Sequence, residues 1–61
     1  MKAQYIIINS EDKYFVKILE NNSILFTDKK DEATKMDWND SQELIPIIES
    51  KTGHICMAEN A

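Results

Sequence analysis

The sequence has few of the residues that small proteins use to brace or bend the chain. It contains one cysteine, one glycine and one proline among 61 residues. Because Cys56 cannot pair within the chain, the disulfide-stapled class of small secreted domains is excluded. With Gly53 as the sole glycine, the glycine-rich loops that cradle phosphate groups are excluded as well, and so is that kind of nucleotide site.

Arginine is absent, and all seven basic residues are lysine. The planar guanidinium fork that binds phosphate through two parallel hydrogen bonds is therefore missing. Eleven acidic residues outnumber the lysines and give a formal net charge of −4. We therefore expect no direct binding to nucleic acid, and a charge of this size ordinarily serves solubility.

Long hydrophobic runs are also missing. The amino-terminal apolar run, residues 5–8, is far shorter than a signal-peptide core or a membrane span, so we expect a cytoplasmic protein without a membrane anchor. Residues 1–61 are expected to form a single domain. A chain this short buries only about 60% of the surface that it exposes when unfolded, so a partner or a second copy would add to its limited stability.

Three short β-strands are predicted in the first half of the chain. Residues 4–9 are rich in isoleucine on both faces, which is typical of a strand in the middle of a sheet. Residues 13–19 follow after a polar turn and form a hairpin with the first strand. The next turn, residues 20–23, contains asparagines that can adopt a positive φ, and residues 24–26 form the third strand.

The connection that follows predicts a helical turn and a fourth extended segment. Asp28 is expected to cap a short helical turn over residues 29–34, with Ala33 facing inward. Residues 35–38 alternate between polar and apolar, which places Met36 and Trp38 on one side of a short strand. Trp38 is then expected to lie in the core.

The main helix is predicted near the carboxyl end. Asp40 and Glu43 have the spacing of a capping box, and an apolar stripe follows up to a stop at Gly53. That stripe consists of Leu44, Ile45, Ile47 and Ile48. Pro46 costs about 3 kcal/mol inside a helix unless it lies in the first turn, so the helix either begins near Ile45 or bends at Pro46.

Residues 54–58 alternate again and predict a last strand, after which residues 59–61 are expected to fray. The order of elements predicts an α+β fold: a small, mostly antiparallel β-sheet of about four to five short strands, one main helix packed on one face, and a short helical turn.

His54 and Cys56 would share one face of that last strand. Structural zinc requires four ligands, and a catalytic nucleophile requires an orienting group and oxyanion donors. Residues 37–41 superficially resemble a calcium loop, but Gln42 stands where the loop requires glycine and Ile48 where it requires glutamate. We therefore expect no catalytic residue, no metal and no cofactor.

Acidic residues gather around the only tryptophan in the middle of the chain. Spaced carboxylates imitate a phosphate backbone and are complementary to the basic groove of a nucleic-acid-binding protein, and an aromatic side chain at their centre is a typical interface anchor. The residues expected to contact a partner are Asp28, Asp31, Glu32, Asp37, Trp38, Asp40 and Glu43. The alternative is that these charges only cap helices and solvate the surface.

The segment 24–36, a strand followed by a Thr-Asp turn and a brief helix with one alanine, resembles a pattern of short proteins encoded by phages and prophages. Helix residues 43–50 and the last strand fit its continuation, although Pro46 departs from it. The opening Met1-Lys2-Ala3-Gln4-Tyr5-Ile6-Ile7 is similar to the start of some small anti-CRISPR proteins. The resemblance implies a host-takeover or anti-defence role, exercised by binding a host nuclease or its nucleic-acid groove.

Two functions are therefore expected in competition. The first is stoichiometric inhibition of a bacterial host or defence protein in the host cytoplasm, through the acidic residues near Trp38 and without turnover. The second is a structural domain that assembles with itself, as a homodimer or a larger oligomer, through an exposed sheet edge or an apolar helix face.

Overall fold

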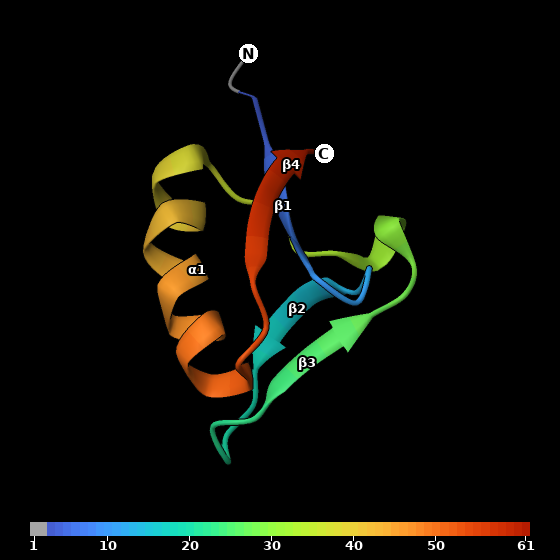
Figure 1. Cartoon of the computed structure of the whole chain (residues 1–61). Helices are drawn as coiled ribbons and strands as arrows, with labels where there is room; N and C mark the ends of the chain where they lie inside the picture. The colour runs from blue at the N-terminus through green and yellow to red at the C-terminus, as the bar shows by residue number, and fades with distance from the viewer. Residues whose placement is uncertain (1–2) are drawn as a thin grey trace.

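The computed structural model describes residues 3–61, in which a single α-helix packs against one face of a sheet of four β-strands (Figure 1). The strands are β1 (Tyr5–Asn9), β2 (Tyr14–Ile18), β3 (Ile24–Thr27) and β4 (Cys56–Asn60). The helical elements are the 3₁₀ turn η1 (Lys30–Glu32) and the helix α1 (Trp38–Thr52). This confirms the predicted α+β fold. Met1 and Lys2, which open the segment similar to anti-CRISPR proteins, lie outside the described residues.

The strands form one antiparallel sheet in the order β3-β2-β1-β4. The interior position predicted for β1 is confirmed, because Ile6 and Ile7 are 1% and 0% exposed although they point to opposite faces. Asn9, at the end of β1, is also buried, and its Oδ1 accepts hydrogen bonds from the backbone N–H groups of Glu11 and Lys13. This amide shapes the turn into β2.

β1 and β2 are paired over only part of their length, and the connection between η1 and α1 fills the space where they diverge. Thr34 donates its backbone N–H to the Phe15 carbonyl at 3.1 Å. Tyr5 and Met36 exchange backbone hydrogen bonds of 2.7 and 2.9 Å. Residues 35–38 were predicted to form a fourth short strand or an extended segment, and the structure has no full strand there but an isolated β-bridge between Met36 and Tyr5.

The core lies between α1 and one face of the sheet. The buried cluster takes one side chain from each of four elements, namely Ile7, Phe15, Ile48 and Cys56. Five half-buried side chains pack against it, which are Ile24, Phe26, Met36, Leu44 and Ile45. The predicted apolar stripe of the helix is thus confirmed except at Ile47, which is 46% exposed. Ser41 takes an inward position on α1 instead, and its hydroxyl donates to the Trp38 carbonyl at 2.7 Å.

The start of α1 differs from the prediction and its end agrees with it. Asp37, not Asp40, is the N-cap, and Pro46 lies within the continuous helix, so the prediction of a start near Ile45 is wrong. Pro46 is exposed, and water can therefore satisfy the carbonyl one turn earlier that receives no N–H. Gly53 ends the helix at φ 74° and donates its N–H to the Glu49 carbonyl at 2.8 Å.

Asp28 does not cap the short turn, because the N-cap position of η1 is Lys29 and has no side-chain cap. Thr27 organises the turn instead. Its Oγ1 accepts the Lys29 N–H at 3.1 Å and its hydroxyl donates to Glu32 Oε1 at 2.8 Å. Ala33 is buried as predicted.

The last strand is Cys56–Asn60 rather than residues 54–58, and the predicted fraying of residues 59–61 is wrong. Glu59 lies opposite Ile6, and Asn60 lies opposite Tyr5. Ala61 extends this pairing, since its N–H donates to the Gln4 carbonyl at 2.9 Å. Pairing with the whole of β1 therefore holds the tail.

Candidate functional site

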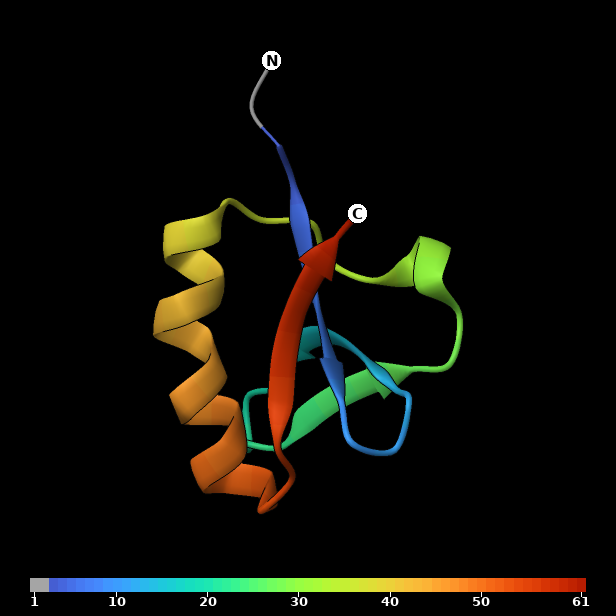
Figure 2. The same cartoon turned by 45° about the horizontal axis from the view of Figure 1, so that its top comes forward.

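The structure divides the seven predicted contact residues into two groups. Those at the amino-terminal end of α1 are Asp37, Trp38, Asp40 and Glu43. Those in or near η1 are Asp28, Asp31 and Glu32. Figures 1 and 2 show η1 and the start of α1 on opposite sides of the β1–β4 pair. The acidic residues therefore form two separate surfaces.

Trp38 lies at the surface, and the prediction that it belongs to the core is wrong. The residue is 51% exposed, and its ring packs edge-on against Tyr5 with 5.2 Å between ring centroids and 66° between ring planes. The chain turns into α1 at this residue instead of continuing as a strand, which carries the indole away from the core. Together with Ala3, Asp37 and Asn39, the two rings line a shallow depression.

Three carboxylates lie at or near the amino-terminal end of α1, and Asp37 is the one that lines the depression with the rings. Asp37 accepts the Asp40 backbone N–H through Oδ1 at 2.8 Å, which is the hydrogen bond of an N-cap. Asp40 and Glu43 are exposed and are three residues apart on the helix, so they lie on the same side of it. We use the name Trp38 face for the amino-terminal end of α1 together with the ring that packs on it, namely Tyr5, Asp37, Trp38, Asp40 and Glu43.

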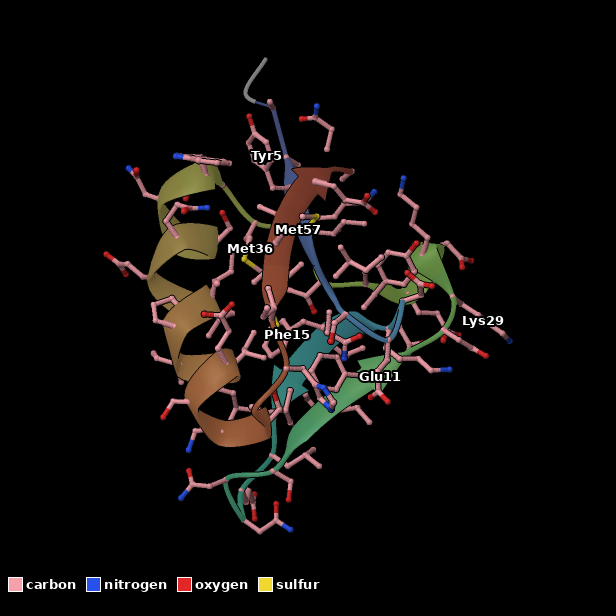
Figure 3. The ribbon with its side chains drawn as sticks, in the orientation of Figure 1. Tyr5, Glu11, Phe15, Lys29, Met36 and Met57 are labelled. Atoms are coloured by element: carbon pink, nitrogen blue, oxygen red, sulfur yellow. The ribbon has the colours of Figure 1, made fainter. Side chains whose placement is uncertain are left out.

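The second acidic group is balanced by lysine. Asp28 and Asp31 are exposed beside Lys29 and Lys30, and Lys29 points away from the sheet (Figure 3). The Lys30 ammonium is 4.0 Å from Glu59 Oε1, between two exposed side chains. Lysines stand among the carboxylates here, so part of the negative charge of this surface is neutralised.

Two further candidates, Ile55 and Met57, were missed at the sequence level. They are 74% and 62% exposed, the highest values among the large hydrophobic side chains of the described residues. Met57 lies on the side of the sheet away from α1, whereas Met36 lies on the α1 side (Figure 3). A shallow hollow next to them is lined by Ile8, Asn9, Ser10, Asp12, Ile55, Cys56, Met57 and Glu59. The alternation around Met57 was visible in the sequence, but which side of the strand the helix covers was not.

His54 and Cys56 do not form a joint site. His54 precedes β4, and its Nε2 is 3.1 Å from Glu11 Oε1, a carboxylate that sequence reasoning did not connect with it. Cys56 is buried, and its backbone N–H donates to Glu49 Oε2 at 2.9 Å. Burial, and secondarily the charge of Glu49, raise the pKa of the Cys56 thiol and so disfavour the nucleophilic thiolate. Residues 3–61 contain no cluster of three or more side chains that could bind a metal ion.

Comparison with known proteins returns no match, since no family model, no curated protein and no solved structure is significantly similar to this chain. The resemblance to phage proteins therefore stays a prediction. Within residues 3–61, α-helices lack the length and apolar character that crossing a membrane requires.

Proposed function

We propose that the protein acts by stoichiometric binding to a basic surface of another protein, through the Trp38 face. The observation that carries this proposal is the exposed indole of Trp38, held edge-on by Tyr5. Tryptophan is among the residues that most often dominate the binding energy of an interface. A ring that is already held in one orientation loses less conformational entropy when a partner covers it.

The charge of the Trp38 face supports a basic partner. The amino-terminal end of a helix carries about half a positive charge, which offsets only part of the charge of three carboxylates. Those carboxylates are Asp37, Asp40 and Glu43. The whole chain, these carboxylates included, carries a formal net charge of −4. A negative surface of this kind accelerates association with a positive one and rejects acidic partners.

The partner in this proposal is a bacterial protein that binds nucleic acid, such as a nuclease of a CRISPR or other defence complex. Its basic groove would receive the carboxylates in place of phosphates. The protein would then be a phage-type inhibitor that works in the host cytoplasm without turnover. The resemblance of residues 24–36 to phage proteins and the acidity of the Trp38 face support this assignment.

The test is affinity capture from bacterial lysate with paired variants, washed at rising salt. The unmodified protein is expected to retain a nucleic-acid-binding protein that is released at high salt, because exposed charge pairs are screened. Asp40→Asn/Glu43→Gln is expected to lose that protein at lower salt. Trp38→Ala is expected to weaken binding about 30-fold or more, the loss of a central aromatic anchor.

The matched control is Asp28→Asn/Asp31→Asn, which removes the same number of charges from the other acidic surface. It is expected to retain the partner as the unmodified protein does. Equal retention by all three variants would show that the Trp38 face is not the binding surface. Asp37 is left unchanged because it also caps α1.

The exposed side chains of Ile55 and Met57 favour a second candidate function, self-assembly. In that case the protein is a structural domain that covers these side chains with another copy. Its signature is a molecular mass and a melting temperature that both rise with protein concentration, and both are measured without any partner.

A further inference from the structure

β4 forms one edge of the sheet and directs part of its backbone away from it. Neighbouring residues of an antiparallel strand direct their N–H and C=O groups alternately to one side and the other. The N–H of Ala61 donates to Gln4 on the β1 side, and the β1–β4 register runs without a shift. The backbone N–H and C=O groups of Met57 and Glu59 therefore also face β1, whereas those of residues 56, 58 and 60 face outward.

One of these outward groups is already satisfied. The N–H of Cys56 donates to Glu49 Oε2 at 2.9 Å, so α1 protects that end of the edge. Ala58 and Asn60 each retain an N–H and a C=O that meet no further strand among residues 3–61. These two residues thus leave four backbone groups in a regular extended geometry open to pairing.

β4 has few of the features with which proteins usually block an edge strand, apart from its short length, the charge of Glu59 and the contact of Glu49 with its first residue. Lysine, proline and bulges are the common devices, and the sequence of β4, Cys-Met-Ala-Glu-Asn, contains neither of these residues. Near the opposite edge, the register between β2 and β3 shifts between Phe15 and Lys17, where the interior strand β2 carries one extra residue, Val16. A bulge of this kind twists a strand and disturbs pairing. The register between β1 and β4 has no such shift, so β4 keeps the regular extended geometry that a further strand requires.

The side chains next to this edge indicate what kind of strand would fit. Met57 and Ile55 offer exposed apolar surface beside the hollow described above. Glu59 and Asp12 line the same hollow, and Glu49 lies at the edge itself. An apolar side chain would be matched against Met57, and a basic one against Glu59 would share that carboxylate with Lys30, whose ammonium lies 4.0 Å from Glu59 Oε1.

We propose that β4 accepts an extended segment of a basic partner protein as a fifth strand of the sheet. The segment places an apolar residue opposite Met57 and, two residues away, a lysine or arginine opposite Glu59. Its backbone pairs with Ala58 and Asn60. A second copy of this chain fits less well, since it presents the same carboxylates and a net charge of −4, and like charges across a strand pair repel.

The probe is an acetylated and amidated heptapeptide, Thr-Lys-Thr-Val-Thr-Lys-Thr, titrated into the ¹⁵N-labelled protein to millimolar concentration. Its valine and lysines share one face of the extended peptide, as the proposal requires. The amide signals of Ala58 and Asn60 are expected to shift and their hydrogen exchange to slow. Replacement of both lysines by glutamate is expected to weaken binding about tenfold, which corresponds to 1.4 kcal/mol.

Backbone pairing is tested separately from charge. Methylation of the peptide nitrogens of residues 3 and 5, which face the edge, is expected to weaken binding about tenfold. Ala58→Pro removes an outward N–H only and is tolerated on an edge strand, so it is expected to reduce binding while Ala58→Ser does not. If Ala58→Pro does not fold, the methylated peptide tests the same hydrogen bonds on the unmodified protein.

Three results would overturn the proposal. The first is the absence of shifts at Ala58 and Asn60, with or without shifts at Trp38. The second is equal binding of the lysine and glutamate peptides. The third is a shift of the same two amides with protein concentration alone, which would assign the edge to a second copy. Because the readout is residue by residue, each of these results leaves the separate test of the Trp38 face unaffected.

Discussion

The two faces of the sheet differ in how completely they are covered. On one face, α1 lies across the strands and buries Ile7, Phe15 and Cys56 against Ile48. On the other face, the connection through η1 lies over Ile6 but leaves Leu25 39% and Met57 62% exposed. The covered face carries the stability of the domain, and the partly covered face is available for contacts with other molecules.

The difference also separates apolar residues that look alike in the sequence. Cys56 and Met57 are neighbours of similar character, yet one is buried and the other is largely exposed. The same holds for Ile48 and Ile47, which are 0% and 46% exposed on α1. Neighbouring positions can therefore be used as matched pairs, one for each environment.

The largest effect is expected for Ile48→Ala, which removes a fully buried side chain from the covered face. It should lower the free energy of unfolding by about 2 to 5 kcal/mol, because both transfer energy and packing are lost. Urea denaturation measures this change. Ile47→Ala serves as the control and should change the free energy by about 0.5 kcal/mol or less, and similar losses for both would mean that α1 does not pack in this orientation.

Thiol labelling compares the two faces at two neighbouring positions of β4, Cys56 and Met57. Cys56 should react with iodoacetamide at least about tenfold more slowly than a thiol placed on the other face by Met57→Cys in a Cys56→Ser background, because reaction at Cys56 requires local opening. The raised pKa of Cys56 slows the reaction further at neutral pH. Equal rates would contradict the burial of Cys56.

The same raised pKa predicts a direction for stability against pH. The folded state holds the Cys56 proton more tightly than the unfolded state does. The resulting stabilisation is complete below the unfolded pKa, about 8.5, and is lost as the pH rises toward the folded pKa. Unfolding measured from pH 7 to 10 should show a decline that Cys56→Ser reduces. An identical decline in that variant would assign the effect to other groups.

A smaller effect is expected at the amino-terminal end of α1, which holds the cover of the sheet in place. Asp37→Ala removes the N-cap hydrogen bond and should destabilise the protein by about 1 kcal/mol. Asp37→Asn keeps an equivalent cap and should stay within a few tenths of a kcal/mol. Thermal unfolding followed by circular dichroism distinguishes the two, and equal losses would mean that the charge rather than the cap matters.

The smallest effect is expected for Met57→Ser on the partly covered face. Since the side chain is largely exposed, the free energy of unfolding should change by about 0.5 kcal/mol or less. The same substitution should nevertheless weaken the binding of the heptapeptide to β4, because it removes the apolar contact proposed for the valine of that peptide. A large loss of stability would show that Met57 is part of the core. It would also contradict the conclusion that this face is available for contacts with other molecules.

Much of the fold could be predicted from local patterns. The isoleucine-rich run at residues 5–9 forms an interior strand because only burial on both faces satisfies it. Gly53 ends α1 because a left-handed residue is least costly for glycine. Asn22 adopts φ 66° in the turn before β3, as an asparagine in such a turn was expected to do.

The candidate surfaces were less predictable, because local patterns at those positions allow two readings. Residues 35–38 alternate between polar and apolar as a strand does. In the structure only Met36 pairs with β1, through Tyr5, and Trp38 is already the first residue of α1. Both Asp37 and Asp40 are good N-caps, and the point at which the chain leaves Tyr5 decides between them. The acidic residues were adjacent in sequence, yet the η1 connection separates them.

The sequence by itself determined the α+β class, the interior strand, the end of the helix and the excess of negative charge. These follow from hydrophobicity, backbone preference and composition, which act over a few residues. Tertiary structure alone decided that Trp38 is exposed, that the two acidic groups lie apart, and that β4 is an edge strand whose Met57 side chain is exposed. Those properties depend on which elements pack together over long distances in the chain, and no local pattern encodes that choice.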